Sequence, residues 1–135
     1  MPARILVIED NPINSELMAY LLRAFGHTIL CARDGDEGLH MAARERPDLI
    51  LCDVGLPRMD GCELARVLKA DPALATIPLV AVTASAMAEQ RQKIVSAGFD
   101  GFLTKPFEVE TFVAQVEQFL ASAKPAPCGT PAQAL

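Results

Sequence analysis

Five side chains with useful chemistry each stand directly after a short apolar run. Glu9 and Asp10 follow the first run, Asp53 the third and Thr83 the fourth, and Lys105 comes at the end of the fifth. Carboxylates brought together repel one another, so a site that gathered all three would keep one protonated or hold a cation between them. The chemistry therefore depends on whether the apolar runs are neighbouring strands of one sheet.

This mixture of groups suits phosphoryl transfer. All-oxygen ligation with few protein ligands is typical of Mg²⁺, which keeps several waters and often bridges to a phosphate. A carboxylate can attack phosphorus and form an aspartyl phosphate, while the metal and Lys105 would offset charge on the transferring group. The Thr83 hydroxyl could donate to a phosphoryl oxygen. Acyl transfer fits less well, because no paired nucleophile and general base is visible.

The apolar runs alternate with helical patterns along the chain. The runs span 5–8, 28–31, 49–52, 79–82 and 101–104. The first, third and fourth are apolar at successive positions, which is typical of strands buried on both faces. Helical patterns cover about 12–26, 34–46, 61–69, 87–97 and 112–120. This alternation predicts an α/β fold with a parallel sheet and helices on both of its faces.

Two of the predicted helices differ in how clearly a buried face can be assigned. The first carries an apolar stripe that is expected to face the core, made of Ile13, Leu17, Leu21 and Ala24 or Phe25. The fourth, over 87–97, is weakly amphipathic, because a polar run over 89–93 precedes its apolar residues. Such a helix is expected to pack loosely.

The order of the elements predicts where the polar residues meet. Right-handed crossovers favour a flavodoxin-like strand order, 2-1-3-4-5, in which the first and third strands are neighbours, as are the third and fourth. The side chains at the strand ends then converge on one crevice. The domain is expected to span residues 1–122, followed by a disordered Pro/Ala-rich tail over 123–135. Met1 directly before the first strand and the short tail favour a stand-alone protein.

Composition excludes several classes of function. The 135 residues make one domain with a net charge of −5, from 17 acidic and 12 basic residues. An acidic domain without a basic stripe argues against nucleic-acid binding. The first apolar run ends at two acids after four residues, so it is neither a signal peptide nor a membrane span. The four cysteines match neither a zinc site nor a disulfide scaffold. Reduced thiols and a cytoplasmic location are expected.

Four stretches, taken together and in order, carry a specific family resemblance: ILVIEDNPIN, PDLILCDVGLPRMDG, IPLVAVTA and AGFDGFLTKPF. With them the chain, from about Arg4 to Leu120, resembles the receiver domains of two-component response regulators, the CheY-like family. The start EDNPIN and the stretch VAVTASAM are similar to stand-alone receivers of the DivK type. The resemblance implies a CheY-like fold and a signalling function that depends on phosphorylation.

The resemblance also implies the roles of the acidic residues. Asp53 would accept a phosphoryl group from a histidine kinase or a histidine phosphotransfer protein. Mg²⁺ would be bound by Asp10, Asp53 and the backbone carbonyl of Gly55, with Glu9 helping directly or through a water molecule. The expected cofactor is therefore Mg²⁺, held by oxygen ligands.

The same resemblance implies a conformational switch. Thr83 and Lys105 would contact the phosphoryl group, and Thr83 would move inward. Phe102, at the position of the family's rotameric aromatic residue, would turn into the vacated space, although a plain core role for it stays open. The surface of the fourth helix, fifth strand and fifth helix would then bind a downstream protein. A monomer is expected, with dimerisation on phosphorylation as an option, and Lys105–Pro106 would be a cis peptide.

Other classes share part of this pattern. A haloacid-dehalogenase-type phosphatase needs a second Asp two residues after its nucleophile, where this chain has Gly55. A flavodoxin has a phosphate loop rich in Ser, Thr and Gly, whereas the loop here begins Glu9-Asp10. A P-loop motif is absent from the sequence. A degenerate receiver is disfavoured by the complete set of charged residues. The expectation is a phosphoacceptor with slow autophosphatase chemistry, not a metabolic enzyme.

Four further residues have structural interpretations. His27 and His40 lie away from the predicted crevice, so surface or packing roles are expected. Cys52 adjoins Asp53, but a buried strand thiol is mostly inert. Gly61 is interpreted as permitting the turn into the third helix.

Overall fold

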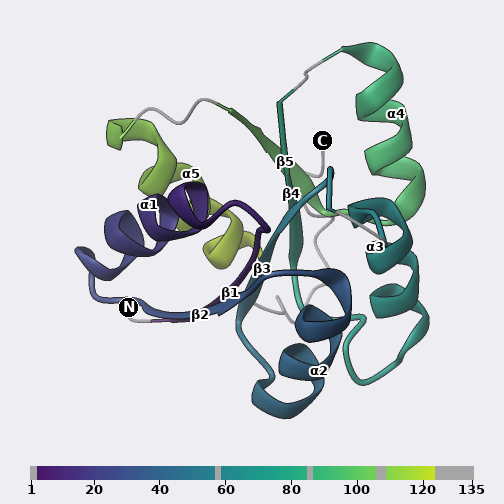
Figure 1. The fold of residues 1–135 in the computed structure, drawn as a ribbon, viewed down its shortest axis with the longest axis horizontal. Coiled ribbons are helices and arrows are strands. Elements are labelled where there is room, and N and C mark those ends of the chain that lie inside the picture. Colours follow the sequence, from purple (N-terminus) through teal and green to yellow (C-terminus); the bar gives the residue numbers. More distant parts are fainter. Residues whose placement is uncertain (1–2, 57–58, 85–86, 106–108, 124–135) are drawn as a thin grey trace.

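A computed structural model describes residues 3–56, 59–84, 87–105 and 109–123. Strands and helices alternate along this part of the chain (Figure 1). The strands are β1 (Arg4–Ile8), β2 (Thr28–Ala32), β3 (Leu49–Asp53), β4 (Leu79–Thr83) and β5 (Gly101–Thr104). The helices are α1 (Pro12–Arg23), α2 (Gly35–Glu45), α3 (Gly61–Ala70), α4 (Ala88–Ala97) and α5 (Val109–Ala123). The predicted tail lies outside the described residues except for Ala123, and the predicted cis peptide at Pro106 lies outside them as well.

The sheet confirms the predicted topology. Its five parallel strands lie in the order β2-β1-β3-β4-β5. Helices α1 and α5 cover one face, and α2, α3 and α4 cover the other (Figure 1). All strand carboxyl ends therefore point to the same edge. No helix in the described ranges is long and apolar enough to cross a membrane.

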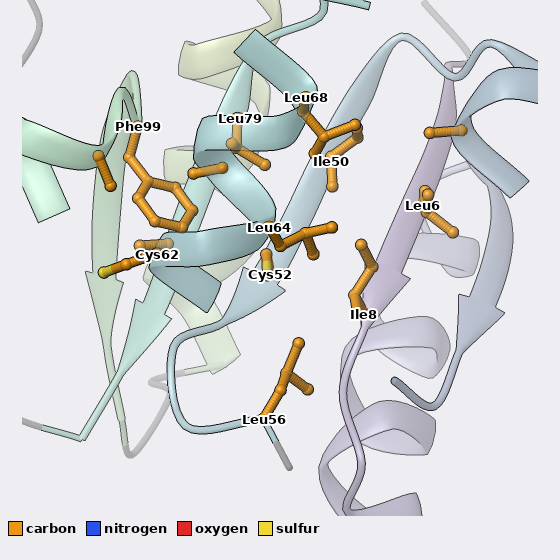
Figure 2. Close-up of a cluster of buried hydrophobic side chains, with 14 of the residues drawn as sticks. Leu6, Ile8, Ile50, Cys52, Leu56, Cys62, Leu64, Leu68, Leu79 and Phe99 are labelled. Atoms are coloured by element: carbon orange, nitrogen blue, oxygen red, sulfur yellow. The ribbon is translucent and has the colours of Figure 1, made fainter. Parts of the chain in front are cut away.

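The continuous apolar runs arise because the side chains of a strand alternate between two hydrophobic cores, one on each face of the sheet. In β1, Leu6 and Ile8 face the cluster under α2, α3 and α4, whereas Ile5 and Val7 face the cluster under α1 and α5. Figure 2 shows the first of these clusters, in which Leu64 of α3 is fully buried. Burying each such aliphatic side chain contributes about 1.5–3 kcal/mol, so both faces stabilise the sheet.

Helix α1 buries a different stripe from the one predicted. Leu21 is buried as expected, but Ile13 is 75% exposed, Leu17 38% and Phe25 62%. The core-facing residues are instead Ser15, Met18, Ala19, Leu21 and Leu22. The helix carries apolar residues on two adjacent stripes. Packing on β1 and β2, rather than the sequence period, decides which of the two stripes faces the sheet. The prediction for this face was wrong, and an apolar stripe is left in water.

The helices differ in how firmly their N-termini are held. Asn11 caps α1, with Oδ1 accepting from the backbone N–H of Ile13 at 2.9 Å. Asp34 and Asp60 cap α2 and α3 in the same way. The N-cap residue of α4, Met87, makes no side-chain capping bond. Such a cap stabilises a helix by about 1 kcal/mol. The starts of α1, α2 and α3 at the carboxyl edge of the sheet therefore have a stabilising bond that the start of α4 lacks.

Among the described residues, one that is not glycine has a left-handed backbone. Arg46, the C-cap of α2, has φ 46° and ψ 67°, and its N–H bonds to the Ala42 carbonyl at 3.0 Å. A residue with a Cβ loses roughly 1–2 kcal/mol in this region, and glycine recovers part of that despite its greater freedom when unfolded. We expect Arg46→Gly to raise the free energy of unfolding by up to about 1 kcal/mol, measured by urea denaturation.

The matched control is Ala43→Gly, in the helical part of α2, where the backbone needs no left-handed residue. That change is expected to lower the free energy of unfolding by about 1 kcal/mol. If both glycines destabilise the protein equally, the left-handed cap carries no strain.

Candidate functional site

Parallel register brings the predicted residues to one edge of the sheet. Ile8 of β1 pairs with Cys52 of β3, so Glu9 and Asp53 follow at the same level. Backbone bonds continue the ladders beyond the strands: Glu9 N–H donates to the Ala32 carbonyl at 3.0 Å, and Lys105 N–H donates to the Thr83 carbonyl at 2.8 Å. The loops after β1, β3, β4 and β5 therefore begin from fixed positions.

Three carboxylates meet there. Glu9, Asp10 and Asp53 each offer one oxygen, and these oxygens all lie within 4.8 Å of one another. Glu9 is buried, Asp53 is half-buried and Asp10 is exposed. The cluster is thus closed on the side of Glu9 and open to solvent on the side of Asp10.

Lys105 reaches into this cluster from the end of β5. Its Nζ lies 3.1 Å from Glu9 Oε1 and 3.6 Å from Asp53 Oδ2. One ammonium offsets one of the three carboxylate charges, so the ionised cluster keeps a net charge of −2. A proton or a divalent cation must offset the rest.

The surroundings of Glu9 favour both a bound proton and a bound cation at this carboxyl. Its Oε2 accepts the N–H of Asn11 at 3.2 Å. Its Oε1 lies 3.1 Å from the Lys105 ammonium and makes no well-formed hydrogen bond within the described residues. Burial raises the pKa of Glu9 to about 7, and the adjacent Asp53 carboxyl acts in the same direction, whereas Lys105 lowers it.

Asp53 is oriented by its own loop and by the start of α3. Its Oδ1 accepts the Gly55 N–H at 3.1 Å, which leaves Oδ2 toward Lys105. Gly61 donates its N–H to the Val54 carbonyl at 2.9 Å. A Cβ at Gly61 would stand 2.7 Å from the Asp53 carbonyl oxygen and 2.8 Å from Val54 Cα.

Gly61 is thus a positioning residue whose role the sequence interpretation misjudged. Its φ is not positive, so the turn does not require glycine. The requirement comes from the close approach of α3 to the backbone of the acidic loop. A glycine directly after the capping Asp60 was the only signal in the sequence, and the contact partner lies seven or eight residues away.

The remaining predicted residues occupy the ends of β4 and β5. Thr83 is 3% exposed at the end of β4. Phe102 in β5 is half-buried and packs against the cluster under α2, α3 and α4. The guanidinium of Arg91 in α4 lies over its ring, 5.4 Å from the centroid. Gly55 is exposed in the loop after β3.

The residues assigned structural roles lie where packing explains them. His27 is buried; its Nδ1 accepts the Ala3 N–H at 3.1 Å, and its Nε2 is 3.0 Å from Glu117 Oε2. His40 is exposed on α2. Cys52 is fully buried, and burial raises the pKa of its thiol well above the usual value. Neither histidine belongs to the acidic cluster.

The donor set fits a small divalent cation. Three carboxylate oxygens, one each from Glu9, Asp10 and Asp53, are close enough to share one ion. Glu9 Oε1, which is buried without a well-formed hydrogen bond in the described residues, would gain a partner if it bound that ion. Mg²⁺ prefers oxygen ligands of this kind and keeps water on its open side, which here would be the side of the exposed Asp10.

Comparison with known proteins defines the class. The family model of the response regulator receiver domain matches residues 5–117. The chain therefore belongs to the response regulator receiver family, which acts in two-component signalling. This membership agrees with the resemblance seen in the sequence, and not with the phosphatase and flavodoxin alternatives.

Individual proteins that resemble this chain include a curated relative and several solved structures. The polar-differentiation response regulator DivK of Brucella anthropi is 37% identical over 123 residues, which are 91% of this chain and 100% of that protein. A putative response regulator structure from Chloroflexus aurantiacus has a TM-score of 0.85 at 30% identity, covering 90% of this chain and 99% of that one. The receiver domain of the sensor histidine kinase PA1611 from Pseudomonas aeruginosa has a TM-score of 0.83 at 31% identity, covering 90% and 100%. That structure has a magnesium ion coordinated in its active-site cleft.

The raised pKa of Glu9 generates a pH prediction. Below about pH 7 the carboxyl keeps a proton that a cation must displace. We expect the Mg²⁺ affinity, measured by titration calorimetry, to rise on the order of tenfold between pH 6 and pH 8. Without metal, the native state holds this proton more tightly than the unfolded state, whose value is 4.5. The free energy of unfolding should therefore fall as the pH rises from about 4.5 through 7.

Glu9→Gln supplies the control for this prediction. It removes the titrating group but keeps the size of the side chain, so its weaker Mg²⁺ binding should depend little on pH between 6 and 8. Equal wild-type affinity at the two pH values would contradict a protonated Glu9.

Proposed function

We propose that this chain accepts a phosphoryl group on Asp53 from a histidine kinase or a histidine phosphotransfer protein. The observation that carries the proposal is the half-buried Asp53 carboxylate, which is oriented by the Gly55 amide and lies close to Lys105 and to two further carboxylates. The Asp53 oxygen forms a bond to phosphorus while the phosphorus–nitrogen bond of the phosphohistidine breaks. The imidazole nitrogen leaves with the electron pair and takes up a proton.

Mg²⁺ is the cofactor in this proposal. Glu9, Asp10 and Asp53 would hold it, together with the backbone carbonyl of Gly55. When bound, the ion would supply positive charge beside the phosphoryl oxygens. The close approach of three carboxylate oxygens supports this assignment, since they would otherwise repel one another.

Lys105 and Thr83 would stabilise the phosphorylated state. Lys105 already lies within 3.6 Å of the Asp53 oxygen, so its ammonium is placed to contact a phosphoryl group there. Thr83, at the end of the neighbouring β4, would donate its hydroxyl to a phosphoryl oxygen. The phosphorylated side chain would carry nearly two negative charges where the carboxylate carried one, and Lys105 and Thr83 would interact with the added charge.

The response would spread to the surface of α4, β5 and α5. As Thr83 moves inward, Phe102 would turn, and the altered surface would bind a downstream protein. Helix α4 supports this role, because in the described chain its buried residues are confined to Ile94 and Ala97 and it lacks a side-chain cap. The chain would act as a switch with slow autophosphatase chemistry rather than as an enzyme, and its resting form would be a monomer.

The exposed stripe on α1 supports a docking surface for the phosphodonor. Ile13, Leu17 and Tyr20 are 75%, 38% and 71% exposed and recur at helical spacing. Helix α1 begins two residues after Asp10, so this stripe starts beside the acidic cluster. A donor protein must bring its phosphohistidine against Asp53, and it can cover this apolar surface as it does so.

Loss of Asp53 tests the acceptor. Incubation with acetyl phosphate and Mg²⁺ should give a single phosphoryl adduct by intact mass, absent without Mg²⁺ and absent in Asp53→Asn. The substitution removes the nucleophilic oxygen and keeps the size of the side chain. An adduct of equal yield in Asp53→Asn would place the acceptor elsewhere, and no adduct on the wild type would contradict acceptance from small donors.

A change on α1 tests the docking surface. Ile13→Glu should lower the rate of transfer from a phosphorylated histidine phosphotransfer protein by about tenfold or more, because a charge replaces an apolar contact. The rate with acetyl phosphate should stay unchanged, since a small donor needs no docking. Val67→Glu on α3, where the wild-type side chain is 47% exposed, is the matched control and should leave both rates unchanged. Equal transfer rates in the two variants would rule out α1 as the docking surface.

A further inference from the structure

Arg91 and Phe102 form a contact between α4 and β5. The guanidinium carbon lies 5.4 Å from the ring centroid, a distance at which a cation is attracted to an aromatic face. Arg91 is exposed and Phe102 is half-buried, so the ring has the apolar cluster beneath it and the guanidinium above it. A planar, weakly hydrated guanidinium suits such stacking better than an ammonium does.

This contact lies where α4 is otherwise weakly attached. The buried residues of the helix, Ile94 and Ala97, are both in its C-terminal half. At the middle of the helix, the Lys93 carbonyl makes one long contact, 3.9 Å, with Cys62 Sγ of α3. Arg91 lies in the N-terminal half, which buries no side chain fully, and its stacking on Phe102 joins this half of α4 to β5.

We propose that Arg91 is a positioning residue that holds Phe102 in its present orientation and so sets the resting balance of the α4–β5 surface. The inference rests on the proposed function, in which Phe102 turns when Asp53 is phosphorylated. A half-buried aromatic ring still exposes part of its apolar area to water, which is unfavourable. Arg91 covers that area, so it stabilises the resting orientation, and turning of the ring breaks the contact.

The contact therefore opposes activation. A group that stabilises the resting state lowers the population of the state that phosphorylation favours. Its removal should make phosphorylation by a small donor easier. Loss of a positive charge alone would lower the rate of phosphorylation, because small phosphodonors are anions and are attracted by nearby cations. The direction of the change thus separates stacking from simple attraction of charge.

The first measurement is the initial rate of phosphorylation by acetyl phosphate with Mg²⁺. Arg91→Ala is expected to raise this rate about two- to fivefold, the change that corresponds to one cation–π contact at an exposed site. Arg91→Lys should raise it as well, since it keeps the charge but loses the planar stacking group. Lys93→Ala, which removes a cation from the exposed side of the same helix, should leave the rate unchanged or lower it.

A double substitution tests whether the effect passes through the ring. In a Phe102→Leu background, Arg91→Ala should produce no further change, because the aromatic face is already gone. A full additional increase in that background would overturn the proposal, as would an unchanged rate in Arg91→Ala.

A second measurement needs no phosphorylation and keeps this inference distinct from the proposed function. The six phenylalanines can be replaced by fluorophenylalanine, and the Phe102 resonance assigned with Phe102→Leu. Arg91→Ala, without donor or metal, should shift that ¹⁹F resonance, while Lys93→Ala should not. An unchanged Phe102 resonance in Arg91→Ala would overturn the proposal even if the wild type is phosphorylated. A shift in a chain that accepts no phosphoryl group would uphold the positioning role and contradict the proposed acceptor.

Discussion

The mutual repulsion of three carboxylates at the ends of β1 and β3 is the constraint around which this domain is arranged. Their oxygens lie within 4.8 Å of one another, and neighbouring parallel strands hold them there whatever their charge. Lys105 offsets one negative charge, and a proton on the buried Glu9 can offset another. If Mg²⁺ binds here as proposed, it would displace that proton, and relief of the repulsion among the carboxylates would contribute to the affinity for the metal.

The surrounding structure keeps this edge rigid on one side and adjustable on the other. Helices α1, α2 and α3 begin with Asn or Asp caps in the loops that adjoin the acidic residues, and Gly61 lets α3 pack directly on the Asp53 backbone. Helix α4 has no such cap and buries few residues. A change of charge at Asp53 therefore meets firm supports around β1 and β3 and a weaker one beyond β4. This asymmetry suits a receiver, in which chemistry at one place is read on another surface.

The likeness to DivK extends over the whole of that relative, since 123 aligned residues cover 100% of it. The matched length of that relative therefore corresponds to one receiver domain. The proposed docking surfaces and the proposed phosphorylation site would therefore share one small domain. The apolar stripe on α1 starts beside the acidic cluster, while α4 lies on the opposite face of the sheet (Figure 1). Separate surfaces would let donor and target be recognised by different residues.

Residue types and their order were enough to predict the strands, the sheet order and the residues that gather at its edge. This worked because buried parallel strands read as continuous apolar runs and because a polar residue after such a run must lie at the carboxyl edge. The tertiary structure decided the face of α1 that is buried, the reason for Gly61, the raised pKa of Glu9 and the stacking of Arg91 on Phe102. Each of these depends on distances between elements, on how a helix rotates on the sheet or how closely a backbone approaches. Local sequence periodicity carries no information about such distances, because they are set by packing among residues far apart in the chain.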